Sequence, residues 1–136
     1  MFDDLKESWF VSEVETVIQT EINSLPDLLK SLSKDLAHAI VIKQYQVRSF
    51  VFAKVDGVRL NPRIAALESV LTFASIYGGQ GEILVHGQDC LGSLKIVSIK
   101  ILKQLEVEQL TVAERGYIEM FISPLIQDVL SEKGHT

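Results

Sequence analysis

The chain has 136 residues, of which 47% are hydrophobic and 23% are charged, with 8 glycines and 3 prolines. This composition predicts one globular domain over residues 1–136 and excludes collagen-like and disordered chains. No stretch approaches the roughly 20 apolar residues of a membrane-spanning helix. The first residues are acidic where a signal peptide is basic, and the single cysteine, Cys90, cannot form an internal disulfide. We therefore expect a cytoplasmic protein that does not insert into membranes.

The net charge of −5 is unevenly distributed along the chain. Residues 1–27 hold one base and seven acids, whereas residues 28–63 hold seven bases and two acids. An acidic chain lacks the clustered basic surface of a nucleic-acid-binding protein, so we expect no nucleic-acid partner. Either the acidic opening and the basic middle face each other, or the basic side chains bind an acidic partner. The candidates for that role share one side of a continuous helix: Lys30, Lys34 and Arg48.

Two helix starts are predicted near the beginning of the chain. Ser12-Glu13-Val14-Glu15 fits a capping box, and apolar residues then recur at helical spacing up to Ile22. A shorter helix from Asp3 or Asp4 would precede this one. Ser24-Leu25-Pro26-Asp27 is the second start, because serine caps, proline suits the first turn and an acid meets the helix dipole.

The region after Asp27 allows two interpretations. A helix over residues 28–52 would have apolar residues on two sides, which is typical of a central helix packed between neighbours. In the competing interpretation Tyr45–Leu60 forms a hairpin, because it is rich in strand-forming residues and Asp56-Gly57 is a strong hairpin-turn signal.

Later elements have clearer signals. Asn61-Pro62 predicts a capped helix that ends at Gly78-Gly79, and a second helix begins at about Gln88. Thr111-Val112-Ala113-Glu114 is another capping box, and it opens a last helix to about Ser131 that Pro124 should kink. We predict an all-α, bundle-like domain of five or six helices, with an α+β domain built on a hairpin at residues 45–60 as the alternative.

The sequence shows no motif of catalysis or cofactor binding. The three histidines have no second histidine or cysteine at the spacing of a zinc site, and no P-loop or nucleophile elbow is present. Cys90 follows an acid, Asp89, which disfavours the reactive thiolate. We therefore predict no catalytic residue, no metal site and no cofactor.

One segment resembles a known family. Phe52-Ala53-Lys54-Val55-Asp56-Gly57, taken as the end of an apolar helix before another capped helix, resembles the helix turns of TerB-like domains. The resemblance implies an all-α fold and a tethered, partner-binding role linked to tellurite and stress response. Such domains have suggested metal contacts at acidic turns. Here Leu60-Asn61-Pro62-Arg63 replaces their capped acidic turn, so the acid is missing and we assign no metal to Asp56.

The last helix has apolar residues around most of its circumference, more than one buried stripe requires. Either its own fold wraps it completely, or part of it meets another chain. In the second case Tyr117, Phe121 and Leu125 would pack against their copies in a homodimer. We expect a small helical adaptor, chaperone-like or regulatory protein that acts by protein–protein interaction. The alternative is an enzyme or small-ligand-binding protein with a pocket near the 78–90 glycine joint, built from Tyr77, His86, Asp89 and Cys90.

Overall fold

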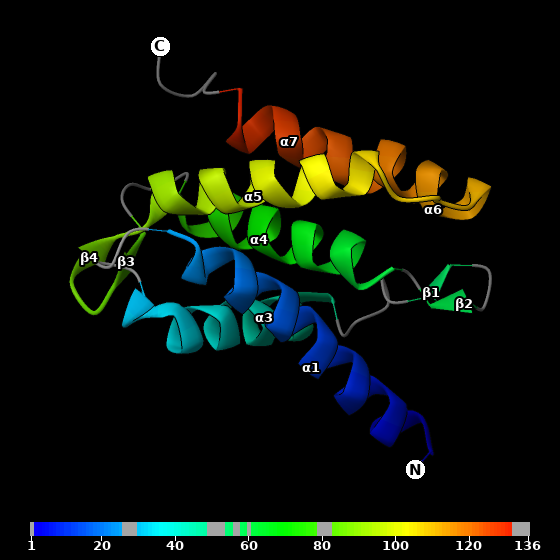
Figure 1. Ribbon diagram of the computed structural model, residues 1–136, viewed down its shortest axis with the longest axis horizontal. Helices are drawn as coiled ribbons and strands as arrows, with labels where there is room; N and C mark the ends of the chain where they lie inside the picture. The colour runs from blue at the N-terminus through cyan, green and yellow to red at the C-terminus, as the bar shows by residue number, and fades with distance from the viewer. Residues whose placement is uncertain are drawn as a thin grey trace.

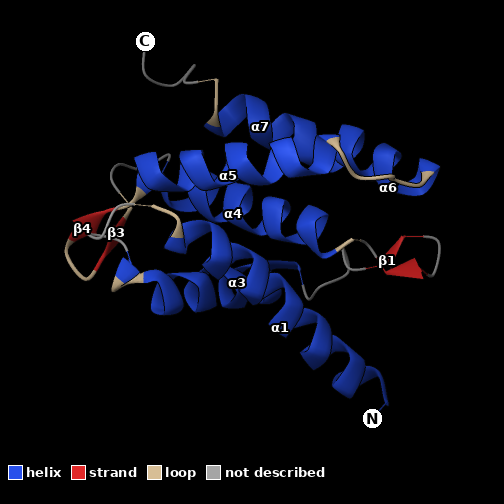
Figure 2. Ribbon diagram, in the orientation of Figure 1, coloured by secondary structure: helices blue, strands red, loops and turns tan. Residues whose placement is uncertain are grey.

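The chain is predominantly helical, which confirms the all-α prediction (Figures 1 and 2). The computed structural model describes residues 2–25, 30–48, 54–55, 58–59, 61–78 and 83–131, and the side chains of 10–25, 30–42, 61–78 and 83–131. The helices are α1 (Phe2–Asn23), α3 (Ser33–Arg48), α4 (Pro62–Gly78), α5 (Leu91–Glu106), α6 (Val112–Tyr117), the π-helix η2 (Ile118–Ile122) and α7 (Ser123–Val129). The strands are β1 (Lys54–Val55), β2 (Val58–Arg59), β3 (Leu84–Val85) and β4 (Gln88–Asp89). With α6–η2–α7 taken as one segment, the described residues form five long helical segments.

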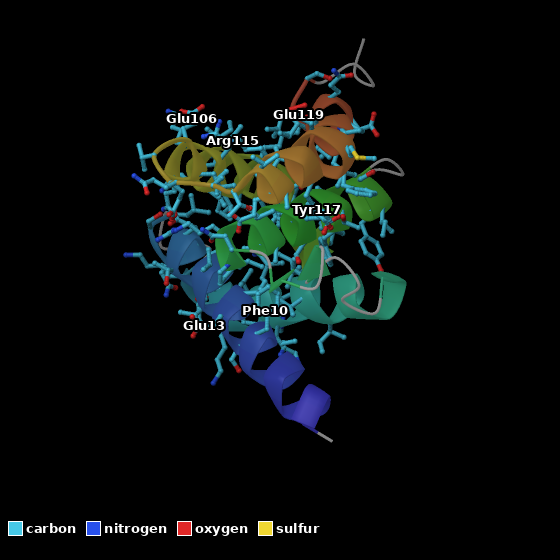
Figure 3. All side chains as sticks on the ribbon, turned by 90° about the vertical axis from the view of Figure 1, so that its right-hand side faces the viewer. Phe10, Glu13, Glu106, Arg115, Tyr117 and Glu119 are labelled. Carbon is cyan, nitrogen blue, oxygen red and sulfur yellow. The ribbon has the colours of Figure 1, made fainter. Side chains whose placement is uncertain are left out.

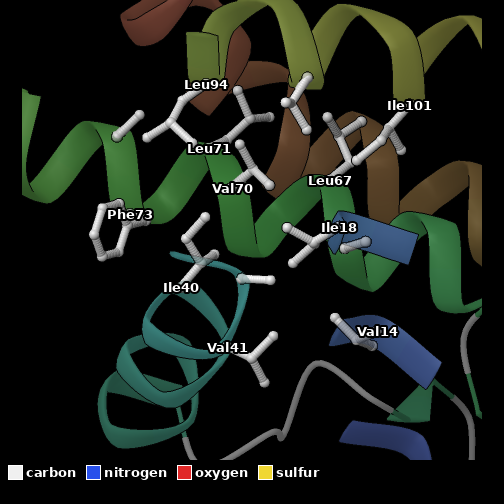
Figure 4. Close-up of a cluster of buried hydrophobic side chains, with 14 of the residues drawn as sticks. Val14, Ile18, Ile40, Val41, Leu67, Val70, Leu71, Phe73, Leu94 and Ile101 are labelled. Carbon is white, nitrogen blue, oxygen red and sulfur yellow. The ribbon is translucent and has the colours of Figure 1, made fainter. Parts of the chain in front are cut away.

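Helix α4 is the centre of the fold. Every residue from Ile64 to Ala74 is buried, and α4 packs against α1, α3, α5 and α7 (Figure 1). Small residues such as Ala65, Ala66 and Ser69 let the neighbouring helices come close. Figure 4 shows how side chains of three neighbouring helices meet those of α4 in one core: Val14, Ile18, Ile40, Val41, Leu67, Val70, Leu71, Phe73, Leu94 and Ile101.

The predicted helix over residues 28–52 is confirmed over Ser33–Arg48 but is not the central helix, and residues 28–29 and 49–52 lie outside the described residues. Helix α3 begins only at Ser33 and ends at Arg48, and one of its sides is open to solvent at Lys34, Asp35 and His38. The second predicted helix start, Ser24–Asp27, lies partly outside the described residues. The pattern of apolar residues on two sides of a segment therefore pointed to α3, whereas the helix that is surrounded by others is α4.

Helix α1 runs through the predicted start at Ser12, so the capping box there is wrong. Helix α1 begins ten residues earlier, at Phe2, and the Ser12 carbonyl accepts a hydrogen bond from the Thr16 hydroxyl (2.8 Å) within it. A capping serine must leave helical geometry. Continuing the helix instead keeps Phe10, Val14 and Ile18, at intervals of four, on one buried face.

The predicted caps of α4 and α6 are confirmed, and one carboxylate joins them. Asn61 Oδ1 accepts from the Arg63 backbone N–H (2.8 Å), and Thr111 forms the full capping box with Glu114. One oxygen of Glu114 accepts from the Thr111 N–H (2.9 Å) and the other from the Asn61 N–H (2.9 Å). This carboxylate therefore ties together the N-termini of two helices that lie 50 residues apart in the sequence.

Both alternatives for residues 45–60 are realised in part. Helix α3 covers the first residues of this region, and strands β1 and β2 pair antiparallel with Lys54 opposite Arg59 and Val55 opposite Val58. This register leaves two residues between the strands, as the Asp56-Gly57 turn signal predicted. The segment that resembles a TerB-like helix turn thus contains a strand at Lys54–Val55 rather than the end of a helix.

A second hairpin, β3–β4, was not predicted. Leu84 pairs with Asp89 and Val85 with Gln88, and the turn residues His86 and Gly87 have φ angles of 53° and 81°. Two successive positive φ angles are those of a type I′ turn, which matches the twist of a hairpin. Strands of two residues are too short to give an alternating pattern in the sequence.

Candidate interaction surface

The three residues predicted to form an interface lie in the C-terminal segment α6–η2–α7 but differ in exposure. Tyr117 is 6% exposed and belongs to the core, and Leu125 is half-buried against that core. Phe121 is 40% exposed, and its ring packs on that of Tyr117 with the centroids 4.8 Å apart. Met120, which was not predicted, is 70% exposed. Besides Val112 at the start of α6, which is 88% exposed, the apolar surface that this segment offers to a partner is that of Met120 and Phe121.

Tyr117 is held by a buried hydrogen bond to the central helix. Its hydroxyl donates to Glu68 Oε1 at 2.6 Å, and Glu68 is fully buried. Figure 3 shows Tyr117 directed inward from the C-terminal segment, whereas Glu106, Arg115 and Glu119 lie on the outside. A buried carboxyl group requires a hydrogen-bond donor, because its removal from water costs several kcal/mol otherwise.

The irregularity predicted at Pro124 takes the form of a π-turn. The Ser123 N–H donates to the Ile118 carbonyl, five residues back, so the turn before the proline is wider than an α-helical turn. Proline lacks an N–H, and its ring clashes with the carbonyl four residues before it, here that of Met120. The wide turn therefore accommodates the proline, and Met120 and Phe121 lie within it.

Helix α5 carries a second exposed apolar surface that sequence analysis missed. Leu94, Val97 and Ile101 face the core, whereas Ile96 and Ile99 are 46% and 41% exposed. The exposed residues of this helix recur at intervals of four and three, and we call them the α5 face: Gly92, Ile96, Ile99, Lys103 and Glu106. The signal was present in the sequence, because two isoleucines fall outside the buried stripe of an otherwise regular amphipathic helix.

Glu21 of α1 and Ser24, the residue directly after α1, hold α5 from one side. Gln104 donates to Glu21 and Lys100 donates to Ser24, both through their side chains. Arg63 Nε donates to Glu108 at 2.9 Å and links the start of α4 to the connection after α5. These contacts hold α5 and the connection after it against the end of α1 and the start of α4, and the residues of the α5 face remain exposed.

The predicted basic residues only partly form a common surface. Lys30 and Lys34 are both exposed, but α3 begins between them, so they do not share a continuous helix. The side chain of Arg48 lies outside the described residues. A role of the three in binding an acidic partner remains a prediction.

Lys34 lines a polar groove of about 440 Å³ between α1 and α3. The groove is crossed by a contact of 2.6 Å between His38 Nδ1 and Glu15 Oε2. His86 Nε2 lies 3.5 Å from Asp35 Oδ2 and links the β3–β4 turn to the same part of α3. The side chains on both walls are polar or small: Ser12, Glu15, Thr16, Gln19, Lys34, Asp35, Ala37 and His38.

The residues of the alternative pocket near the glycine joint have different environments. Cys90 is fully buried, Tyr77 is half-buried against Phe73, and His86 and Asp89 are exposed. Burial raises the pKa of the Cys90 thiol, and the Asp89 carboxylate raises it further, against the opposing effect of a backbone hydrogen bond at Val85. The thiolate that a nucleophilic cysteine requires is therefore disfavoured.

Within the described residues, no group of three or more His, Cys, Asp or Glu side chains is placed to hold a metal ion. No helix in the described part of the chain is long and apolar enough to cross a membrane. No protein-family model matches the sequence, and the searches of curated proteins and of solved structures found no match either. The resemblance to TerB-like domains therefore stays a prediction.

Proposed function

We propose that this protein acts by binding other proteins, as a small adaptor, chaperone-like or regulatory protein of the cytoplasm. One observation carries the proposal. Four large apolar side chains remain 40–70% exposed on helix faces that point away from the central helix: Ile96, Ile99, Met120 and Phe121. Large apolar residues gathered on a surface and bordered by charges are typical of protein-binding sites.

The arrangement of the helices supports this proposal. Helix α5 and the α6–η2–α7 segment both pack against α4, and each of them carries one of the two exposed apolar surfaces (Figure 1). Charged side chains border them, with Glu106 and Arg115 on the outside of α5 and α6 and Glu119 beside Met120. A role in stress response, which the TerB-like resemblance implies, belongs to the same proposal.

The proposal is tested by capturing partners with the tagged protein from the cells that produce it, and by measuring the affinity of each purified partner. Ile96→Glu and Met120→Glu place a charge on each surface. Ile42→Glu is the matched control, because Ile42 is 37% exposed on a different helix, α3.

We expect at least one of the two variants to bind a purified partner about tenfold or more weakly than the wild type does, while the control binds with normal affinity. All variants should remain helical by circular dichroism. Partners that bind both variants as tightly as the wild type would refute the proposal.

A further inference from the structure

The two sulfur-containing side chains that the structure describes, those of Cys90 and Met120, have opposite environments. Cys90 is fully buried, and its thiol donates a hydrogen bond to the Gln88 carbonyl at 3.4 Å. Burial also raises the pKa of this thiol, so the thiolate through which a cysteine is oxidised is disfavoured. Met120 is 70% exposed in the π-helix η2, and a thioether reacts with an oxidant without losing a proton first. An oxidant in solution therefore reaches the sulfur atom of Met120 and not that of Cys90.

The helical turn that precedes Met120 leaves space around its thioether. Helical side chains lean toward the preceding turn, and the residue four positions before Met120 is Gly116. A Cβ built on Gly116 would have no heavy atom within 4 Å, so this part of the surface is open. Pro124, four positions after Met120, is also exposed. A molecule as small as hydrogen peroxide can therefore approach the sulfur atom without any movement of the fold.

Met120 is also the most exposed of the four apolar side chains on which the proposed function depends. Its neighbour Phe121 is 40% exposed, and the Phe121 ring packs on that of the buried Tyr117. Oxidation of the thioether to a sulfoxide replaces a flexible apolar group on this surface by a polar one. Because binding at such a surface depends on the apolar area that a partner covers, the sulfoxide weakens binding without any change of the backbone.

We propose that Met120 is an oxidation site at which hydroperoxides make the surface of Met120 and Phe121 more polar and so weaken partner binding. With hydrogen peroxide, a lone pair of the sulfur attacks one peroxide oxygen, the S–O bond forms and the O–O bond breaks. The second oxygen leaves as hydroxide and takes the proton of the new S–OH group, which gives the sulfoxide and water. The sulfur loses two electrons and the peroxide gains them. The effect on binding rests on the proposed function, whereas the oxidation itself requires no partner.

The first experiment treats the folded, full-length protein with hydrogen peroxide and follows the gain of one oxygen atom by mass spectrometry with peptide mapping. A synthetic peptide of residues 116–125 is the reference for a fully accessible thioether. We expect Met120 in the folded protein to be oxidised at a rate within about fivefold of that in the peptide, because most of its surface is exposed. The mapping separates Met120 from Met1, and Cys90 should remain unmodified. Slower oxidation of Met120 than this would overturn the proposal.

The second experiment measures the change of the surface without any partner. The oxidised wild type should elute earlier than the untreated protein from a hydrophobic-interaction column, while its melting temperature stays the same because Met120 lies outside the core. Met120→Leu is the matched control, because leucine keeps the surface apolar and has no sulfur atom to oxidise. Its retention should not respond to peroxide beyond any effect of Met1, which both proteins carry. An equal response of the two proteins, or a lower melting temperature after oxidation, would contradict the proposal.

Partner binding separates this inference from the proposed function. A purified partner that Met120→Glu weakens should bind the oxidised wild type about tenfold or more weakly and the peroxide-treated Met120→Leu variant normally. If Met120 is oxidised and the protein elutes earlier, but no protein binds either surface, the oxidation site stands and the adaptor role is wrong. If a partner depends on Met120 but its affinity is unchanged by the sulfoxide, the inference is wrong and the proposed function stands.

Discussion

Replacing Tyr117 by phenylalanine removes one hydroxyl from the core and nothing else. That hydroxyl donates to Glu68 Oε1 at 2.6 Å, where Tyr117 is 6% exposed and Glu68 fully buried. The ring, its contact with Phe121 and the helical geometry of the segment remain. The change therefore tests whether the buried hydrogen bond anchors the C-terminal segment to the central helix.

The expected loss follows from the burial of the acceptor. Removal of one partner of a buried hydrogen bond leaves the other without the interaction and without water, which costs about 1–3 kcal/mol. An exposed hydrogen bond would cost much less, since water replaces the lost partner. We expect Tyr117→Phe to lower the free energy of unfolding by about 1–3 kcal/mol.

Urea unfolding followed by circular dichroism measures this loss, because the midpoint falls while the slope of the transition stays constant. Thr72→Val is the matched control. Thr72 lies one turn from Glu68 and is 8% exposed, and its Oγ1 has no hydrogen-bond partner among the described residues. Removal of that hydroxyl should leave stability unchanged or raise it by up to about 1 kcal/mol. A Tyr117→Phe variant as stable as the wild type would refute the reasoning.

Three further changes have defined outcomes. Asn61→Ala should lower the free energy of unfolding by about 1 kcal/mol, because the Arg63 N–H loses its hydrogen bond to the capping side chain. Asn61→Asp keeps an oxygen acceptor and should leave the melting temperature nearly unchanged. Gly87→Ala should lower the free energy of unfolding by about 1 kcal/mol, because the φ angle of Gly87 is 81°. Gly116→Ala should raise it by roughly 0.5–1 kcal/mol, because Gly116 lies on α6 and an added Cβ would meet open space. The melting temperatures of the two variants should therefore move in opposite directions. Burial raises the pKa of the Cys90 thiol, so the unfolded chain loses this proton at a lower pH than the folded chain does, and the free energy of unfolding should fall as the pH rises above about 9. This fall should be smaller in Cys90→Ala, and an equal fall in the variant and the wild type would contradict the prediction.

Local chemistry was sufficient where a few neighbouring residues decide the structure. Asn61-Pro62 and Thr111-Val112-Ala113-Glu114 begin helices as predicted, because each cap satisfies backbone N–H groups within three residues. The Asp56-Gly57 signal likewise fixed the two-residue connection between β1 and β2. The same kind of signal failed at Ser12, where burial of Phe10 and Val14 on one face outweighs a cap.

The identity of the central helix could not be predicted from α4 itself. One side of α4 has only small or polar residues, which is typical of a solvent-exposed helix face. All of them are nevertheless buried: Ala65, Ala66, Ser69 and Thr72. Small side chains are compatible both with water and with close helix packing. Only the positions of α1, α3, α5 and α7 distinguish the two.

The candidate surface shows the same division. The sequence by itself determined that the last helix has more apolar residues than one face can bury and that Pro124 interrupts it. The tertiary structure alone decided that Tyr117 turns inward to Glu68, that Met120 and Phe121 remain outside, and that Ile96 and Ile99 face solvent on α5. The reason is physical: periodicity defines which residues share a helix face, but burial of that face depends on what packs against it, and here those partners come from segments distant in the sequence.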